Sequence, residues 1–298
     1  MKKTAKWFAL LALVAALTLA GNSATAATRS KGHLFIIGGG QQPAEMTRRF
    51  IELAGGTNRA KIIVIPMASE DAEDSGKHQV AVFQSFGVTR VESVVFTREE
   101  ADSPASVARF ADATGVFFTG GDQTRLAAIV TNTAVHRRLK ELHARGAVLG
   151  GTSAGAAVMS EIMITGEELR NDDKTNAFTF IRRDNIETKA GFGFITNAII
   201  DQHFIKRKRL NRLFSVVLEH PNLVGIGIDE STAVIVNPDN TFEVIGESAV
   251  MVMDPRTATH FQTDPKGNLS ASGIRTHILL AGDRFDLIHG RILGGAGN

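Results

Sequence analysis

The residues Ala147-Val148-Leu149-Gly150-Gly151-Thr152-Ser153-Ala154-Gly155 decide the fold class of this chain. A short apolar run breaks at glycines, reaches a single serine, and continues into a run suited to a helix. This layout is typical of a nucleophile elbow, where only small neighbours fit and the serine hydroxyl is lifted above the sheet edge at a helix N-terminus. The motif favours a serine hydrolase. Because a chain with 29 glycines also uses such turns for packing, a base and an orienting acid must be found as well.

Apolar runs on both sides of the elbow alternate with amphipathic stretches. The expected buried strands are Leu34 to Ile37, Ile62 to Ile65, Val91 to Phe96, Val116 to Phe118 and Ala147 to Leu149. The expected helices are Ala44 to Leu53, Lys77 to Phe86, Pro104 to Ala111 and Ala134 to Arg145. This alternation predicts an α/β fold with a mostly parallel sheet flanked by helices.

After Ile228 the sequence pattern changes to short, closely spaced strands separated by turn signals. Turn signals lie at Asn237-Pro238-Asp239-Asn240, Asp254-Pro255 and Asp264-Pro265-Lys266-Gly267. These signals predict an antiparallel extension at the C-terminal end. No repeat or linker interrupts the sequence, so we expect one α/β domain over residues 27–298.

The first 26 residues have the pattern of a secretory signal peptide. Three lysines precede an apolar stretch from Trp7 to Ala20, and Ala24-Thr25-Ala26 offers a cleavage site. The apolar stretch is shorter than the ~20 residues that cross a bilayer, so we expect export, to the periplasm or the medium, without a membrane anchor. Cleavage removes three lysines from a formal net charge of +2 and leaves −1, which gives no basis for binding nucleic acid.

Composition and motifs also exclude several chemistries. The chain has no cysteine, so it has no disulfide, thiolate nucleophile or thiolate metal site. It contains no His-Glu-x-x-His, and the glycines at 38–40 lack the spacing of a dinucleotide fingerprint. We therefore expect neither a metal nor a cofactor.

Three polar clusters follow apolar strands, where ligands collect in an open parallel sheet. They are Thr119-Gly120-Gly121-Asp122-Gln123, the elbow at Ser153, and Asp201-Gln202-His203. A serine hydroxyl needs an imidazole to take its proton and a third group to orient that imidazole. His203 is the favoured base because it ends a buried strand, whereas His136 and His143 share a charged helix face and are expected at the surface.

The orienting acid has two candidates at the end of the run Val224-Gly225-Ile226-Gly227-Ile228, namely Asp229 and Glu230. Asp229 could instead cap the turn at Ser231-Thr232. An order typical of α/β-hydrolases would pair Asp229 with His260 or His277, which leaves His203 without a role.

The combined motifs carry a resemblance that no single motif carries. They are Phe118-Thr119-Gly120-Gly121-Asp122-Gln123, Gly150-Gly151-Thr152-Ser153-Ala154-Gly155-Ala156, Asp201-Gln202-His203-Phe204 with Arg207, Arg209 and Arg212, and Gly227-Ile228-Asp229-Glu230. In this order, over roughly residues 32–281, the chain resembles the cyanophycinases, which belong to the serine peptidase family that also contains aspartyl dipeptidase (peptidase E).

The resemblance implies a flavodoxin-like core similar to class I glutamine amidotransferases, with Ser153 as nucleophile, His203 as general base and Glu230 as orienting acid. It implies cyanophycin as substrate, a polyaspartate that carries arginine on each side-chain carboxyl, and β-Asp-Arg as product. It also implies a homodimer. Backbone N–H groups of Gly121 and Ala154 are the expected oxyanion donors.

Such a substrate presents carboxylates and guanidinium groups, so its site needs fixed charges of both signs. The expected substrate-binding residues are Gln123, Asp201, Gln202, Arg207, Arg209 and Arg212. From composition alone, Lys206 to Arg209 would be the solvated face of a helix. The alternative functions are a peptidase of the same family acting on aspartyl or isoaspartyl dipeptides, and a non-catalytic binding protein.

Overall fold

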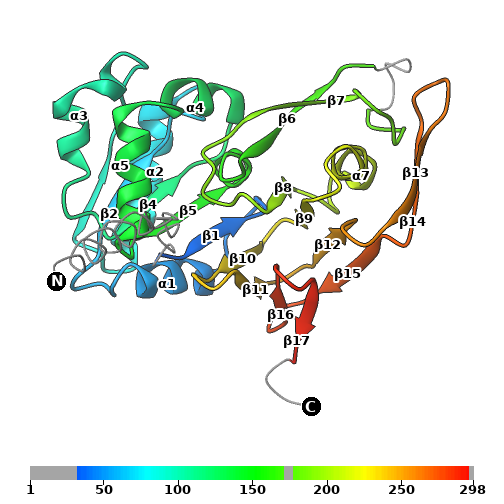
Figure 1. Ribbon diagram of the computed structural model, residues 1–298. Helices are drawn as coiled ribbons and strands as arrows, with labels where there is room; N and C mark the ends of the chain where they lie inside the picture. Colours follow the sequence, from blue (N-terminus) through cyan, green and yellow to red (C-terminus); the bar gives the residue numbers. More distant parts are fainter. Residues whose placement is uncertain (1–31, 171–176, 295–298) are drawn as a thin grey trace, which may run out of the picture.

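The computed structural model describes residues 32–170 and 177–294 of the chain (Figure 1). The expected signal peptide at 1–26 lies outside these residues and stays a prediction. The described chain forms a nine-stranded sheet, a four-stranded sheet and two two-stranded ribbons. No helix in the described ranges combines the length and apolar character that crossing a membrane requires.

The parallel half of the nine-stranded sheet is the part that the sequence predicts best. Its strands are β1 (Leu34–Ile37), β2 (Lys61–Ile65), β3 (Arg90–Ser93), β4 (Gly115–Phe118) and β5 (Val148–Thr152). They pair in the order β1-β5-β4-β2-β3, every pair parallel. All five predicted strands are confirmed. Four are apolar runs that are largely buried on both faces, whereas the edge strand β3 is at most half-buried and ends at Ser93, before the predicted end at Phe96.

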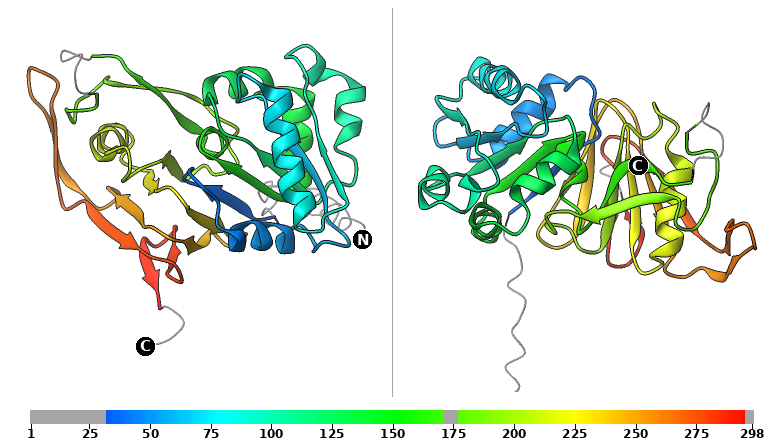
Figure 2. Two further views of the ribbon diagram at one scale, coloured as in Figure 1. Left: turned by 180° about the vertical axis from the view of Figure 1, so that it is seen from behind. Right: turned by 90° about the horizontal axis from the view of Figure 1, so that it is seen from above.

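Helices cover both faces of this parallel sheet (Figure 2). They are α1 (Ala44–Leu53), α2 (Ala72–Ser85), the 3₁₀ turn η1 (Glu100–Asp102), α3 (Pro104–Arg109), α4 (Gln123–Val130), α5 (Ala134–Ala144) and α6 (Ala154–Ala157). Phe50 of α1 and Phe83 of α2 pack on one face with Phe35 and Phe117. Leu126 of α4 and Leu139 of α5 belong to the larger core on the other face.

The sequence missed α4, although its start carries an ordinary signal. The carboxylate of Asp122 accepts hydrogen bonds from the backbone N–H groups of Thr124 and Arg125, which makes Asp122 the N-cap. The sequence pattern at 119–123 predicts only a ligand-facing turn. The same residues serve both purposes, because the turn that ends β4 also starts α4.

The antiparallel extension is confirmed. Strands β10 (Thr232–Val236), β11 (Thr241–Gly246), β16 (Arg284–Asp286) and β17 (Arg291–Leu293) continue the nine-stranded sheet beyond β1, every pair antiparallel. The turn predicted at 237–240 joins β10 to β11. Phe242 and Phe285 stack across this extension with their ring centroids 5.5 Å apart.

A second sheet, which the sequence did not predict, holds the later polar cluster. It consists of β8 (Ala198–Gln202), β9 (Val224–Ile228), β12 (Val250–Asp254) and β15 (Arg275–Leu279) in the order β15-β12-β9-β8. β8 and β9 are parallel, so the residues that follow them meet at one edge. Helix α7 (Leu210–Glu219) packs Leu213, Val216 and Val217 on this sheet.

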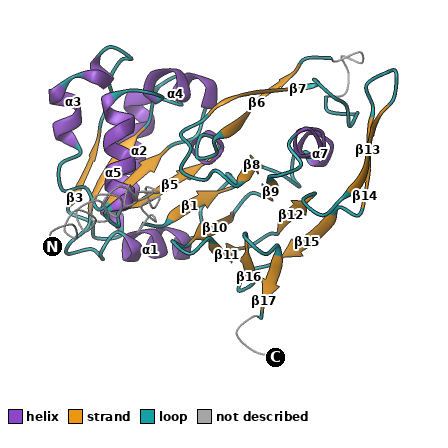
Figure 3. Ribbon diagram, in the orientation of Figure 1, coloured by secondary structure: helices purple, strands orange, loops and turns teal. Residues whose placement is uncertain are grey.

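Two ribbons project from this part of the molecule (Figure 3). They are β6 (Ile162–Glu168) with β7 (Ile186–Ala190), and β13 (Thr259–Thr263) with β14 (Leu269–Ser272). In Figure 1, α7 is seen end-on between the β6–β7 ribbon and the four-stranded sheet. The expected basic helix face at 206–209 is instead an exposed turn before α7, because the helix starts only at Leu210.

Candidate active site

Ser153 is the single residue between β5 and α6, and it lies in a strained turn. Its φ is +54° and its ψ −112°, a conformation that non-glycine residues rarely adopt and that strained functional turns use. A side chain at Gly151 would collide with the carbonyl of Gly155, and one at Gly155 with the carbonyl of Phe118. The two glycines are therefore required for strand and helix to meet this closely, as the elbow motif predicts.

His203 and Glu230 lie in line with the serine hydroxyl. Ser153 Oγ is 2.8 Å from His203 Nε2, and His203 Nδ1 is 2.6 Å from Glu230 Oε1. An ionised carboxylate can only accept, so Nδ1 carries the hydrogen and the lone pair of Nε2 faces the hydroxyl. The structure thus brings together three side chains that lie up to 77 positions apart in the sequence, in the arrangement of a Ser-His-acid triad.

One turn of backbone positions all three residues. The consecutive carbonyls of Ile37, Gly38 and Gly39, at the end of β1, accept from the N–H groups of Ser153, His203 and Ser231 respectively. The distances are 3.0, 2.7 and 2.9 Å. Ser231 directly follows Glu230, so the same three-residue segment fixes the backbone at each position of the line.

The glycines of that segment are needed for close approach rather than for flexibility. A side chain at Gly39 would collide with the His203 ring, and a Cβ at Gly40 would lie 2.8 Å from Cβ of Glu230. Both glycines have positive φ, 104° and 72°. From the sequence alone these glycines have no predicted role in the site, although their position at the carboxyl end of a strand is a usable signal.

Burial lowers the pKa of His203 below its ordinary value of 6.5, and the positive charges of Arg207 and Arg209 lower it further. The hydrogen bond from Nδ1 to Glu230 acts in the opposite direction. The side chain is only 8% exposed, whereas that of Glu230 is 29% exposed. The imidazole is therefore neutral at neutral pH and available as a proton acceptor.

The turn after β4 passes close to the side chain of Ser153. Gly120 and Gly121 form the turn after β4, and a Cβ at Gly120 would lie 3.4 Å from Cβ of Ser153. Within the described part of the chain, no acceptor bonds the N–H of Gly121 or of Ala154. Both groups are thus free to bind an oxygen that carries developing negative charge.

The structure corrects the prediction that Asp201 and Arg212 bind substrate. The two side chains form a bidentate ion pair and each residue is 1% exposed, so no substrate group reaches them. Nη1 of Arg212 has no hydrogen-bond partner among the described residues, and the guanidinium lies over the ring of Phe178. The pair joins β8 to α7, and Asp201 lies two residues before His203 in the chain.

Two other predicted substrate-binding residues, Gln202 and Gln123, are buried and hydrogen-bonded within the protein. Gln202 is buried, and its carbonyl and side-chain oxygens accept from Nη1 of Arg209. The amide nitrogen of Gln123 is buried against the carbonyls of Ile164 and Thr165 in β6. These contacts hold both glutamines to the protein.

Arg207 is free to meet a substrate, whereas the Arg209 side chain is only 12% exposed and its Nη1 lies 3.8 Å from Asp201 Oδ1. Arg207 is exposed in the turn that follows His203. Burial and the nearby charge of Arg212 lower the pKa of Arg209 to about 10, so this guanidinium is still charged at neutral pH. Both cations lie close enough to His203 to lower its pKa.

Asp229 serves the scaffold and not the imidazole. Its carboxylate accepts from the backbone N–H groups of Ile205 and Lys206 and from the hydroxyl of Ser248. The alternative pairing of Asp229 with His260 or His277 is therefore not formed. The expectation that His136 and His143 are solvated is also wrong, because both are buried and pack against the Phe194 ring; burial lowers the pKa of His143 to about 4.

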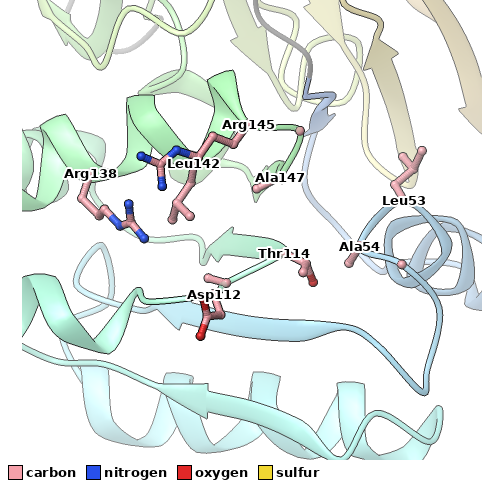
Figure 4. A pocket seen from close by; sticks show the side chains of 11 residues that line it. Leu53, Ala54, Asp112, Thr114, Arg138, Leu142, Arg145 and Ala147 are labelled. Carbon is pink, nitrogen blue, oxygen red and sulfur yellow. The ribbon is translucent and has the colours of Figure 1, made fainter.

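Two cavities lie away from the serine. One of about 410 Å³ lies at the amino ends of β4 and β5 and is lined by Asp112, Arg138 and Arg145 (Figure 4). The other, of about 480 Å³, lies between α1 and α2 and begins at Gly40. In residues 32–170 and 177–294, no group of three His, Asp or Glu side chains is placed to hold a metal ion.

Comparison with known proteins adds to this geometry. The model of peptidase family S51 matches residues 34–244. A cyanophycinase from Nostoc sp. is 35% identical over 272 residues, which cover 89% of this chain and 88% of that protein. A cyanophycinase from Synechococcus elongatus is 35% identical over 265 residues, covering 86% and 80% respectively.

The fold also matches a solved structure. A peptidase from an acI-B1 actinobacterium superposes with a TM-score of 0.60 over 87% of this chain and 98% of that one, at 23% identity. This likeness supports the assignment of the α/β fold.

Proposed function

The chain belongs to peptidase family S51 and is a cyanophycinase-like peptidase, and we propose that it hydrolyses cyanophycin to β-Asp-Arg dipeptides through an acyl-enzyme on Ser153. The observation that carries the proposal is the continuous hydrogen-bonded line Ser153–His203–Glu230. The likeness to the cyanophycinases over nearly nine-tenths of the chain supports the substrate class.

In the proposed mechanism Ser153 Oγ attacks the scissile carbonyl carbon while its proton passes to His203 Nε2. Glu230 holds the ring in the tautomer that can accept this proton and stabilises the imidazolium that forms. His203 then gives the proton to the leaving amine. A water molecule, activated by the same imidazole, hydrolyses the ester and regenerates the serine.

The oxyanion formed in each step is held by the N–H groups of Gly121 and Ala154. Their lack of other acceptors supports this role, because a donor already engaged would have to break a bond first. Loss of one such donor typically costs ~3 kcal/mol of transition-state stabilisation. The strained elbow at Ser153 sets the direction of the Ala154 N–H at the start of α6.

Arg207 and Arg209 are the proposed ligands for substrate carboxylates. Arginine suits this task because its guanidinium binds a carboxylate with two parallel hydrogen bonds. Burial of Asp201 behind Arg212 leaves the rim next to His203 with a net positive charge, which favours the carboxylates of the polymer over its guanidinium groups. Asp201 and Arg212 act in this proposal only as support.

The site of action is proposed from the leader-like residues 1–26: an exported enzyme that acts on polymer released by other cells. A homodimer is part of the same proposal, by likeness to the family. N-terminal sequencing of the purified native protein tests the export step, which predicts a start at Ala27. Retention of Met1 in protein from the cytosol would contradict it.

Incubation of the purified protein with insoluble cyanophycin, followed by mass spectrometry of the soluble products, tests the function. We expect β-Asp-Arg to accumulate with the wild type and not with Ser153→Ala. A second candidate, an aspartyl or isoaspartyl dipeptidase, would instead cleave soluble dipeptides and leave the polymer intact. Cleavage of neither substrate would overturn the proposed activity.

A further inference from the structure

The cavity between α1 and α2 has the composition of a binding site that the catalytic residues do not account for. Its volume of about 480 Å³ is in the range of small-ligand sites. Val82 and Phe86 form an apolar part of its lining, and the polar residues Gln41, Gln42, Thr47, His78 and Gln79 form the rest. An apolar surface with a few converging polar groups is what ligand sites usually offer.

The polar lining of this cavity is unpartnered. Gln79 is 8% exposed and Thr47 is 5% exposed, yet neither side chain has a hydrogen-bond partner within the described ranges of the chain. The polar atoms of both side chains still reach open space, since neither is among the fully buried atoms that lack a partner in the described residues. An amide and a hydroxyl that no protein group bonds and that line one cavity are available to a ligand there.

The start of α1 adds donors to the same cavity. Pro43 is the N-cap and gives the helix no side-chain cap, so the N–H groups of Ala44 and Glu45 lack intrahelical acceptors. Ala44 itself lines the cavity. A helix N-terminus favours carboxylates, while a glutamine amide can donate to a carbonyl and accept from an N–H of a peptide-like chain.

The cavity adjoins the catalytic line. It begins at Gly40, and a Cβ on this glycine would lie 2.8 Å from Cβ of Glu230. Gly40 in turn follows the residues whose carbonyls bond the catalytic backbone. A chain bound at Ser153 that extends past Glu230 would therefore meet this cavity next.

From these observations we propose that the cavity between α1 and α2 is a second subsite, which binds a carboxylate-bearing polyamide segment of the substrate remote from the scissile bond. The inference rests on the proposed hydrolysis of the aspartate polymer. The Gln79 amide binds the backbone of the segment, and the free N–H groups at the start of α1 bind one of its carboxylates.

The effect of substrate length on KM distinguishes a role of this subsite from a role of the catalytic site. Gln79→Leu removes the amide at nearly constant volume, and we expect KM for a long β-Asp-Arg oligomer to rise about tenfold with kcat unchanged. For an oligomer too short to reach the cavity from Ser153, KM should not change. Gln84→Leu is the matched control, because Gln84 lies exposed on the same helix outside the cavity.

Each result of this comparison is decisive. An equal effect of Gln79→Leu on both oligomers, or no effect on either, would overturn the subsite while leaving the hydrolase intact. Failure of the wild type to cleave either oligomer would overturn the proposed function, and the subsite with it. Should Gln79→Leu not fold, as judged by circular dichroism, the near-isosteric Thr47→Val variant provides the same test with the same expected split between the oligomers.

Discussion

Two groups of hydrogen-bonded polar side chains lie near the end of β8, and they differ in their exposure to solvent. The line from His203 to Ser153 and Glu230 opens to solvent, with the Glu230 side chain 29% exposed. The ion pair of Asp201 with Arg212 is shielded from solvent, with each residue 1% exposed, although Asp201 lies only two residues before His203. Both groups join a carboxylate to a nitrogen base at hydrogen-bonding distance.

The difference between them comes from one residue's backbone. Asp201 lies within β8 and points into the interior, whereas His203 follows the strand with a φ of +48°. That left-handed turn takes its ring out of the strand's alternation and toward the elbow. Similar chemistry two positions apart thus serves proton transfer in one case and support in the other, and burial decides which.

The largest expected effect concerns the open line. Glu230→Gln keeps the size of the side chain but removes the charge that fixes the His203 tautomer, so we expect kcat to fall on the order of 10²- to 10⁴-fold. Thermal unfolding should change little because the Glu230 side chain is partly exposed. Steady-state kinetics on cyanophycin measures the effect, and a variant with near-normal kcat would remove Glu230 from the mechanism.

Substitution in the buried pair of Asp201 and Arg212 should lower the stability of the protein. Arg212→Met removes the bidentate partner of the buried Asp201 carboxylate and leaves only Arg209, whose Nη1 lies 3.8 Å from Asp201 Oδ1, so we expect the free energy of unfolding to fall by about 3–5 kcal/mol. The double variant Asp201→Asn, Arg212→Met should recover part of this loss, because no charge is then left unpaired. Urea denaturation measures both.

A stable Arg212→Met protein with a raised KM would contradict this account. It would mean that the guanidinium meets substrate after all, and that the two groups at the end of β8 do not differ as described.

The smallest expected effect is on pH dependence. Because the pKa of His203 lies below 6.5, the base stays neutral and the free enzyme stays active somewhat below that pH. Arg207→Gln removes a positive charge that lowers this pKa, so the acid limb of the kcat/KM profile should move to higher pH. The shift should shrink at high salt, which screens an exposed charge.

Lys208→Gln is the matched control for this titration, since Lys208 is exposed one position further on and is not among the main groups that shift the pKa of His203. An acid limb that moves equally in both variants would mean that general surface charge, and not Arg207, sets the pKa.

The sequence predicted the fold where local patterns and tertiary burial agree. The strands of the parallel half and the turns of the extension follow directly from apolar runs and from Asn, Asp, Pro and Gly signals. It did not predict that β8 and β9 form a separate sheet, because parallel pairing across a long crossover leaves no local mark. The helix α4 was missed because its N-cap coincides with a functional turn.

For the site, the sequence predicted which residues converge better than what surrounds them. Ser153, His203 and Glu230 meet as expected, since each follows a strand end. The burial of Arg212 and the exposure of Arg207 were not predictable, because an arginine cluster looks the same in sequence whether it faces water or a buried carboxylate. The sequence could not predict the role of the backbone carbonyls at residues 37–39, because any residue type supplies a backbone acceptor.

Rapid-quench mass spectrometry tests the central claim most directly: the enzyme is mixed with cyanophycin, stopped in acid during turnover, digested and mapped. We expect an acyl adduct on the peptide that contains Ser153, and no such adduct in Ser153→Ala. Turnover by Ser153→Ala, or an adduct confined to another residue, would contradict it.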